Sequence, residues 1–416
     1  MASVSVAMMR RGTRCARRLM DAMNLDLTDR QRRIVALADD LALRFAGRAD
    51  QYDRESGFPF ANLADLRESG YLRLVVPQIY GGEGAGLFEM VLAQEHLARG
   101  CGSTAMAVDM TIHLIGRLAE TAAWPEPLFG MVCRSVAEEG ALINSAATEA
   151  DLGSPSRGGV PATRARPVAG GWRVTGRKLF VSMAPALRWF LVSAALPPDD
   201  ETPHGAVGSF LIEAGSPGMR LEESWGDALS LRASASYDLT LDDVFVPAER
   251  LVERAPVGEP PRPGVPTQMA WFALTLAAVY LGIGQAACDA VCAYARERSP
   301  TALGRPIATL PHIQRRVGAI QVALRAARST LYQTARAWEE FPAERAAMTP
   351  HIATAKYLCT NAACDATDQA LRIAGGFALT RSLPLERYFR DARAGLTHPP
   401  HDDAALELIG KHLLGV

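Results

Sequence analysis

Lysine is almost absent from this chain of 416 residues: Lys178, Lys356 and Lys411 are its only lysines, and arginine supplies the remaining positive charge. The formal net charge is −1. A chain so close to neutrality has no overall attraction to nucleic acid or to an anionic membrane surface, so we predict neither as a partner. We interpret the excess of arginine as the codon bias of a GC-rich genome rather than as a recognition surface.

The seven cysteines are scattered and form no CxxC pair and no cluster with histidine at zinc-ligand spacing. This pattern excludes the common structural zinc sites, and we predict no bound metal. Scattered thiols favour a reducing compartment, so we expect a cytoplasmic protein. The sequence also lacks the glycine-rich dinucleotide, P-loop, HExxH and GxSxG motifs, so any cofactor must be held in another way.

One apolar run, residues 269–287, is long enough to raise the question of a membrane span. Gly282, Gly284 and Gln285 interrupt it and a charged stretch follows, so we predict a helix buried at a subunit interface instead. Residues 1–26 are rich in arginine and lack the apolar stretch of a secretion signal. We expect them to form a frayed extension.

Three hydrophobic patterns follow one another along the chain. Residues 27–140 have a helical period, and residues 141–258 have the alternation and the Pro/Gly punctuation of short strands. A Pro-rich linker at residues 255–266 leads to residues 267–416, where the helical period returns. The patterns predict an α+β fold with an N-terminal helical domain, a small middle β-barrel or sandwich and a C-terminal four-helix bundle. The stripes behind this prediction are Trp172/Val174/Gly176, Trp189 to Val192 and Tyr237/Leu239/Leu241 for strands, and Ile313, Val317, Ile320, Leu324, Ala327 and Leu331 for a long helix.

Two short segments of the β region have the composition of a cofactor site. Residues 145–154 combine small side chains with the hydroxyls of Thr148 and Ser154. Phe180 and Ser182 are two residues apart and so lie on one face of a strand, where an aromatic plane beside a hydroxyl suits a flat heterocycle. Either segment alone is more typical of an ordinary loop or strand.

Taken in order, these and four further segments resemble the acyl-CoA dehydrogenase family and the flavin monooxygenases of the same fold. The resemblance extends over about residues 27–416. Its parts are similar to the family's GY…P…YGG segment, TEP-x-AGS signature, flavin-facing Trp and Thr, R-x-S…DDV-x-VP segment, QIxGG motif and RDAR motif; here they are residues 70–82, 148–154, 180–182, 232–247, 372–376 and 390–393.

The resemblance implies a flavin, an acyl thioester or other small substrate, and an assembly of like subunits, a dimer or tetramer. The residues that would contact the flavin ring or its ribityl chain are Ala147, Thr148, Phe180 and Ser182. Those that would reach the FAD of a neighbouring subunit are Arg298, Arg372, Gly375 and Gly376, and those near the substrate are Ser154 and Arg232. The segment after Arg298 has two residues more than the family's RxxFG motif and lacks its phenylalanine, which leaves FMN open beside FAD.

The carboxylate base of the family is missing from both of its usual positions. Eight residues after the aspartate of RDAR stands Pro399, and the alternative position on the first bundle helix is Phe272. Nearby candidates for acid–base or hydrogen-bonding work are His398, Asp402 and Asp403. A further candidate is His113, because the resembling monooxygenases have flavin-facing histidines in these two regions. The ordinary alternative is a solvated turn around 397–403 and a core histidine at 113.

Three functions stay open at this point. The signature segments put first the dehydrogenation of an acyl-CoA or acyl-carrier thioester with a displaced base, with electrons passed to an acceptor flavoprotein. The lost glutamate favours either a monooxygenase supplied with reduced flavin by a flavin reductase, or a non-catalytic subunit that completes the FAD site of a partner.

Overall fold

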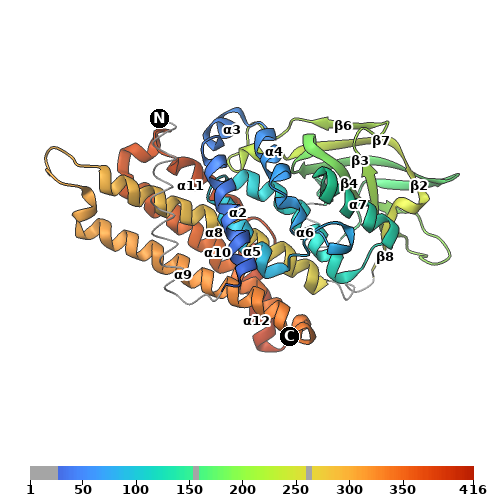
Figure 1. The fold of residues 1–416 in the computed structure, drawn as a ribbon. Helices are drawn as coiled ribbons and strands as arrows, with labels where there is room; N and C mark the ends of the chain where they lie inside the picture. The colour runs from blue at the N-terminus through green and yellow to red at the C-terminus, as the bar shows by residue number, and fades with distance from the viewer. Residues whose placement is uncertain (1–26, 153–158, 259–264) are drawn as a thin grey trace.

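The computed structural model describes residues 27–152, 159–258 and 265–416. A helical part is followed by a β-sheet and then by a helical bundle, as the sequence patterns predict (Figure 1). The predicted frayed extension, residues 1–26, and Ser154 lie outside the described residues. The N-terminal helices are α2 (Asp29–Ala46), α3 (Ala49–Glu55), α4 (Phe60–Glu68), α5 (Leu87–Ala98), α6 (Gly102–Thr121) and α7 (Glu126–Glu139). The bundle consists of α8 (Val265–Glu297), α9 (Pro311–Glu340), α10 (Thr349–Ala374), α11 (Leu385–Arg393) and α12 (Asp402–Leu414).

Helix α2 begins at a capping box. The Thr28 hydroxyl accepts a hydrogen bond from the Gln31 amide, and the Gln31 side chain accepts one from the Thr28 amide. This reciprocal pairing satisfies donors that a helix start would otherwise leave free. The buried residues of α2 recur at helical spacing, so that one face of the helix packs on α5.

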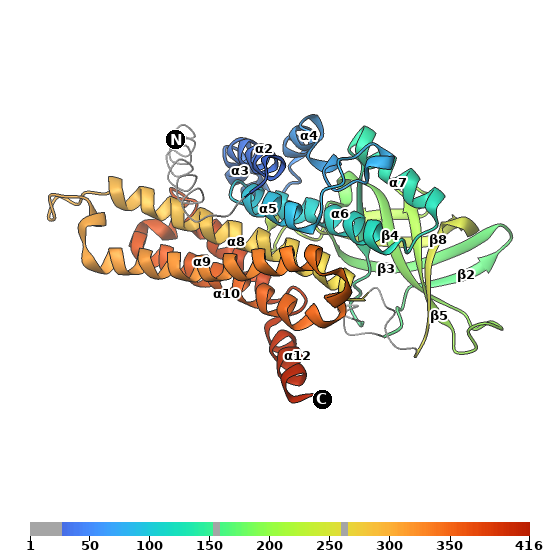
Figure 2. The ribbon, with the colours of Figure 1, turned by 60° about the horizontal axis from the view of Figure 1, so that its bottom comes forward.

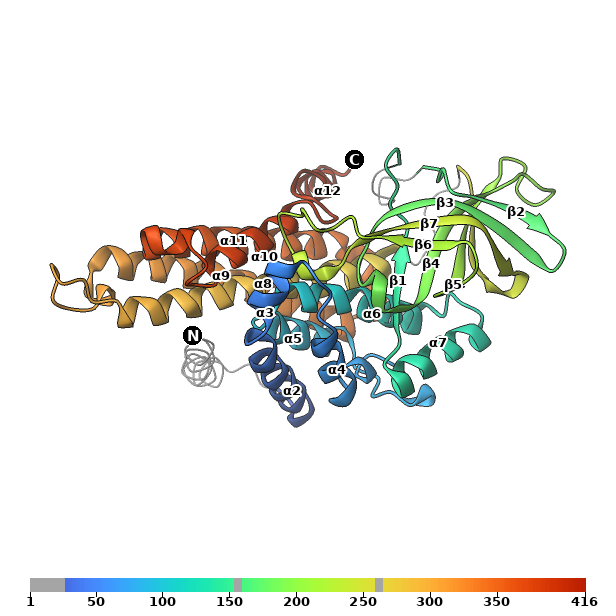
Figure 3. The same cartoon turned by 90° about the horizontal axis from the view of Figure 1, so that it is seen from above.

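The strands form one eight-stranded sheet, which curves strongly at one end of the molecule (Figure 3). Its order is β6-β7-β3-β2-β4-β5-β8, and β1 pairs with β4 outside this path. The alternating residues Val174, Leu239 and Leu241 are buried, as the period of two predicts. The strands are β1 (Leu142–Ala146), β2 (Arg164–Val168), β3 (Gly171–Val181), β4 (Leu187–Leu196), β5 (Ala206–Glu213), β6 (Met219–Glu222), β7 (Tyr237–Pro247) and β8 (Leu251–Pro256).

Helix α8 occupies the centre of the helical region (Figure 2). It is the one helix among the described residues that is long and apolar enough to cross a membrane, but 94% of its most apolar stretch is buried. The prediction of a buried helix is therefore confirmed. Its cover comes from α5, α6, α9, α10 and α11 of the same chain, so the predicted subunit interface is not needed to bury it.

The long bundle helix α9 buries Ile313, Ile320 and Leu324 along one face, in agreement with the predicted stripe. The predicted linker is shorter than expected. Its first two residues, 255–256, complete β8, and its last two, 265–266, begin α8.

Candidate functional site

The segment after β1 and the end of β3 lie side by side where these two strands end. The Leu179 amide donates to the Thr148 carbonyl over 2.9 Å, and Asn144 Nδ2 donates to the Ser182 carbonyl over 3.1 Å. The structure thus brings together the residues predicted to contact a flavin, Ala147, Thr148, Phe180 and Ser182, and none of them is buried. Their contact with a flavin stays a prediction.

Phe180 has two properties that separate it from an ordinary strand residue. Its φ of +59° lies in the left-handed region, and the pairing of β3 with β7 shifts register between Lys178 and Val181. Its ring is 57% exposed and meets the Trp225 ring edge to face, with 5.7 Å between the centroids. A strained backbone that holds an aromatic ring in the open is typical of a ligand site.

A short chain of hydroxyls begins at Ser182. Its Oγ lies 2.8 Å from Ser236 Oγ, which lies 2.8 Å from Ser234 Oγ. Trp225 is held in place separately, because its Nε1 donates to the Leu231 carbonyl over 3.1 Å. The end of β3 therefore offers an aromatic pair next to a chain of donors and acceptors.

His398 lies on the turn between α11 and α12 and is anchored from inside. Its Nδ1 is 2.8 Å from the hydroxyl of Tyr280, a fully buried residue of α8. Lys356 of α10 is also fully buried, and its Nζ donates to the Gly395 carbonyl over 2.7 Å. Burial, together with the nearby Lys356 charge, lowers the pKa of His398 to about 4. The imidazole is therefore neutral at physiological pH.

The two carboxylates predicted beside His398 face other partners. Asp402 Oδ2 accepts a hydrogen bond from Asn361 Nδ2 over 3.0 Å, and the residue begins α12. Asp403 is exposed at the same helix start, where a negative charge is favourable. Both carboxylates therefore have a structural role at the start of α12.

His113 lies on α6, opposite the first turns of α8. Its Nδ1 is 2.9 Å from the carbonyl oxygen of Asp109, one helical turn earlier. Its ring meets the ring of Phe272 edge to face, with 5.0 Å between the centroids. Burial lowers the pKa of His113 to about 3. This histidine therefore stands, neutral, beside one of the two positions where the expected base is missing.

The Asp109 side chain is part of a buried polar network behind His113. Gln94 Nε2 donates to Asp109 Oδ1 over 2.9 Å, and Thr275 Oγ1 lies 3.1 Å from Asp109 Oδ2. The Thr275 hydroxyl is also 2.6 Å from the Trp271 carbonyl, which takes its single proton. Burial raises the pKa of Asp109 to about 7. A protonated Asp109 then satisfies this network, because its Oδ2–H donates to Thr275.

Asp109→Asn should remove one pH dependence of stability. A raised carboxyl pKa gives stability that is complete below the unfolded pKa of about 4 and is lost as pH rises through about 7. The asparagine can keep both hydrogen bonds and does not ionise. Denaturant unfolding measures the free energy of unfolding of both proteins. We expect the variant's advantage over the parent to grow by on the order of 2 kcal/mol as the pH rises from about 5 to about 8. Parallel pH curves for the two proteins would show that Asp109 is ionised throughout.

The far end of the bundle brings together two segments that are remote in sequence. The Arg298 guanidinium lies over the Phe377 ring, 4.9 Å from its centroid. Phe377 comes directly after the pair Gly375-Gly376, and the φ of Gly375 is +62°. A Cβ added at either glycine would meet no atom of another described residue within 4 Å. Arg372 donates to Asp368 on the helix surface over 2.7 Å. Arg298 and the glycine pair thus share one open surface, and their role in a neighbour's site stays a prediction.

Arg232 and the RDAR motif join the sheet to the helices. Arg232 donates to the Ser56 hydroxyl over 3.0 Å and to the Gly226 carbonyl over 3.2 Å. Arg390 forms a bidentate pair with Asp53 at 2.6 and 3.0 Å, and Asp391 Oδ1 accepts from the Leu231 amide over 2.7 Å. These contacts hold the loop of Trp225 and Leu231 against α3 and α11. The predicted substrate contact of Arg232 stays a prediction.

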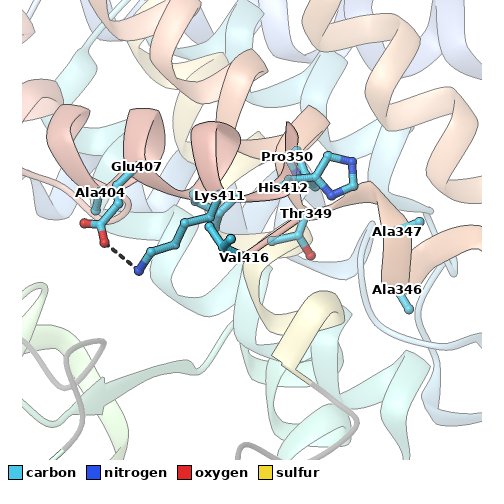
Figure 4. Close-up of a pocket in the computed structure, with 10 residues that line it drawn as sticks. Ala346, Ala347, Thr349, Pro350, Ala404, Glu407, Lys411, His412 and Val416 are labelled. Carbon is cyan, nitrogen blue, oxygen red and sulfur yellow. Dashed lines mark ion pairs between the residues drawn. The ribbon is translucent and has the colours of Figure 1, made fainter. Parts of the chain in front are cut away.

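A groove of about 510 Å³ lies elsewhere, between α12 and the start of α10 (Figure 4). Lys411 and Glu407 form an ion pair of 2.6 Å along its side, and Thr349 and His412 line it. None of the predicted site residues lines this groove, so it is separate from the candidate site.

Three sequence models of one family match the chain in the order of its structural parts. The acyl-CoA dehydrogenase N-terminal domain matches residues 28–123, the middle domain residues 144–244 and the C-terminal domain residues 265–414. The chain belongs to the acyl-CoA dehydrogenase family. The family is flavin-dependent; a nitrososynthase is among the similar sequences, and methanesulfinate monooxygenase MsuC of Pseudomonas fluorescens shares the fold, with a TM-score of 0.79 at 22% identity.

Similar proteins come from more than one branch of the family. YdbM of Bacillus subtilis (strain 168), whose name gives acyl-CoA dehydrogenase as a provisional assignment, is 40% identical over 91% of this chain and 96% of its own length. L-evernosamine nitrososynthase of a Micromonospora strain is 30% identical over 93% of this chain and 91% of its own. The X-ray structure of KijD3 in complex with FMN and dTDP-3-amino-2,3,6-trideoxy-4-keto-3-methyl-D-glucose superposes with a TM-score of 0.81 at 28% identity, covering 94% and 95% of the two chains.

The residues at the end of β3 and after β1 fit the flavin that the family implies. Phe180 and Trp225 offer an exposed aromatic surface, and Ser182 and Thr148 offer hydroxyls next to it. Sequence reasoning missed Trp225, Tyr280 and the buried position of Lys356. The one signal that pointed to Lys356 was the rarity of lysine, which we interpreted as codon bias.

Proposed function

We propose that the protein is a flavin-dependent monooxygenase that receives reduced flavin from a separate reductase. The observation that carries this proposal is a pair of neutral histidines, His113 and His398, where the family's carboxylate base is missing. Reduced flavin and O₂ would supply the oxygen: one atom enters the substrate, the other leaves as water, and the flavin ends oxidised. The nitrososynthase and the FMN complex among the similar proteins support the same branch.

The candidate bases for dehydrogenation are poorly suited to that task. Removing the α-proton of an acyl thioester calls for a base whose pKa lies near the working pH. Burial holds the pKa of His398 at about 4 and that of His113 at about 3, so both are weak bases. Asp402 is engaged with Asn361, and Asp403 faces solvent.

The chain's own residues have separate tasks in the proposed reaction. Phe180 and Trp225 would hold the flavin ring, and Thr148 and Ser182 would orient it. His398 would donate a hydrogen bond where negative charge develops on oxygen, and a fixed donor in a dry site is worth far more than one in water. Phe272 and Tyr280 make the α8 side of the site apolar and so help to exclude water.

Acyl-thioester dehydrogenation is the second candidate function, supported by the 40% identity to YdbM. Under that function one of the histidines would have to act as the base despite its low pKa. The third possibility, a subunit without chemistry of its own, is disfavoured because both histidines are held by buried partners and an exposed aromatic pair with hydroxyls beside it is kept at the end of β3.

The deciding experiment compares two flavin reactions of the purified, flavin-loaded protein. We expect oxygen to be consumed when an NADH-linked reductase supplies reduced flavin, and we expect no anaerobic bleaching by a panel of acyl-CoAs. His398→Ala should lower the productive, peroxide-free fraction of oxygen use by about 10²-fold. The matched controls are His412→Ala and the double variant Asp402→Asn/Asp403→Asn, which should retain it. Bleaching by any acyl-CoA without added reductant would replace this proposal with the second.

A further inference from the structure

The two site histidines are held by different kinds of partner, and this difference determines where each carries its proton. His113 Nδ1 faces the Asp109 carbonyl at 2.9 Å. A carbonyl oxygen only accepts hydrogen bonds, so Nδ1 must be the donor. In the neutral ring the second nitrogen, Nε2, then has a free lone pair and is an acceptor.

His398 has a hydroxyl as its partner, which could donate or accept. Tyr280 is fully buried, and burial raises its pKa well above 10, so its hydroxyl keeps its proton. Within the described part of the chain, that hydroxyl has His398 Nδ1 as its hydrogen-bond partner. If His398 donated, the Tyr280 proton would be buried without an acceptor, at a cost of about 1–3 kcal/mol. Tyr280 therefore donates to Nδ1.

The surroundings of His398 disfavour a second proton on its ring, so the imidazole stays neutral. Lys356 Nζ donates a hydrogen bond to the carbonyl of Gly395, three residues before His398, and so places a positive charge next to this turn. Asp402 is turned toward Asn361, where its Oδ2 accepts a hydrogen bond. The residue is half-buried, and Nε2 is the ring nitrogen that Tyr280 does not engage.

We infer that Tyr280 is a positioning residue that fixes His398 as a neutral imidazole protonated on Nε2, while the Asp109 carbonyl fixes His113 in the opposite tautomer. His398 Nε2 is then a hydrogen-bond donor and His113 Nε2 an acceptor. As a donor, His398 could not take a proton at Nε2. The meaning of this pair for oxygenation rests on the proposed function; the tautomers themselves do not.

Solid-state NMR of the flavin-loaded protein with ¹³C,¹⁵N-labelled histidine tests the inference without turnover. The chain has eight histidines, and His398→Gln and His113→Gln assign the two resonances of interest. At neutral pH we expect the Nε2–H pattern for His398 and the Nδ1–H pattern for His113. An Nδ1–H pattern for His398, or an Nε2–H pattern for His113, in the parent protein would overturn the inference, even if no variant of Tyr280 folds.

Tyr280→Phe tests the positioning role itself. We expect the His398 signals to change to a mixture of tautomers, and kcat for reductase-coupled oxygenation to fall about tenfold with KM changed less than about twofold. Tyr388→Phe, which changes a buried tyrosine of α11, should move neither. Unchanged His398 signals in Tyr280→Phe would overturn the role of Tyr280. If the predicted tautomers are found in a protein that shows no oxygenation, the inference stands and the proposed function fails.

Discussion

Replacing Glu95 with alanine should lower the free energy of unfolding by about 3–5 kcal/mol, because two arginines in the interior lose their counter-charge. Glu95 lies on α5 and is fully buried. Its Oε1 accepts hydrogen bonds from Arg328 of α9 at 2.7 and 2.9 Å and from Arg99 at 3.0 Å. Its Oε2 accepts one from the Tyr332 hydroxyl at 2.6 Å. This carboxylate therefore joins the N-terminal helices to the bundle.

The protonation of Glu95 gives the same contact a pH signature. Burial by itself would raise the pKa of Glu95, but the Arg328 and Arg99 guanidiniums outweigh burial and hold it well below its usual range. A lowered carboxyl pKa contributes stability that is complete above the unfolded pKa of about 4 and is lost as pH falls below it. The parent protein should therefore lose this contribution in acid, and the alanine variant should not.

Chemical denaturation of the parent, Glu95→Ala and the near-isosteric Glu95→Gln measures the effect. Both variants should be destabilised, since the glutamine keeps the shape but leaves the guanidiniums unpaired. Glu407→Ala removes one partner of the exposed pair with Lys411 and should leave the free energy of unfolding almost unchanged, because solvent screens that pair. A loss for Glu95→Ala as small as that of Glu407→Ala would mean that Arg99 and Arg328 find other partners or water.

Much of the fold could be predicted because its hydrophobic patterns are regular. The stripe of α9 and the alternation of β7 each follow one period over several turns or residues, and the structure buries most of the residues that they mark, while Val317 and Tyr237 are half-buried. The apolar run of α8 was correctly interpreted as buried. Its cover was wrongly assigned to another subunit, because a sequence does not show which of its own helices surround a given one.

The candidate site could be predicted only in part. Thr148 and Phe180 come together because strand pairing places their segments side by side, and local motifs marked both. The contact of Tyr280 with His398 joins residues 118 positions apart, and no local period indicates such a pair. Because this contact could not be predicted, the tautomer of His398 could not be predicted from the sequence either, and the chemistry of His398 depends on that tautomer.

The rarity of lysine has a structural side that codon usage does not explain. Of the three lysines, Lys178 and Lys356 are fully buried, and only Lys411 lies on the surface. A compact ammonium can be buried against one carboxylate or carbonyl, whereas the five donors of an arginine fork are harder to satisfy in a small space. Where lysine is so rare, a lysine is a candidate for a buried position.

Lys178→Met should weaken flavin binding by about 10–100-fold, because a buried carboxylate next to the predicted flavin contacts Thr148 and Phe180 loses its counter-charge. Lys178 Nζ donates to Glu149 Oε1 over 2.6 Å and to the Ser193 hydroxyl over 3.1 Å. Glu149 also accepts from the amides of Ala162 and Thr163 at 2.6 and 3.0 Å. The neighbouring residues Thr148 and Leu179 form the bond that holds the two flavin segments together, so the loss of the pair should loosen that bond.

A second variant separates the charge from the packing. Burial would raise the pKa of Glu149, but the hydrogen bond from Lys178 and those from residues 162–163 outweigh it and lower that pKa, so the native pair is ionised. In Lys178→Met/Glu149→Gln no charge is left buried, and we expect most of the stability and flavin affinity to return. Flavin titration by fluorescence, with thermal unfolding of the same samples, measures both. If the double variant binds flavin no better than Lys178→Met, the defect comes from the lost lysine contacts rather than from an unpaired charge.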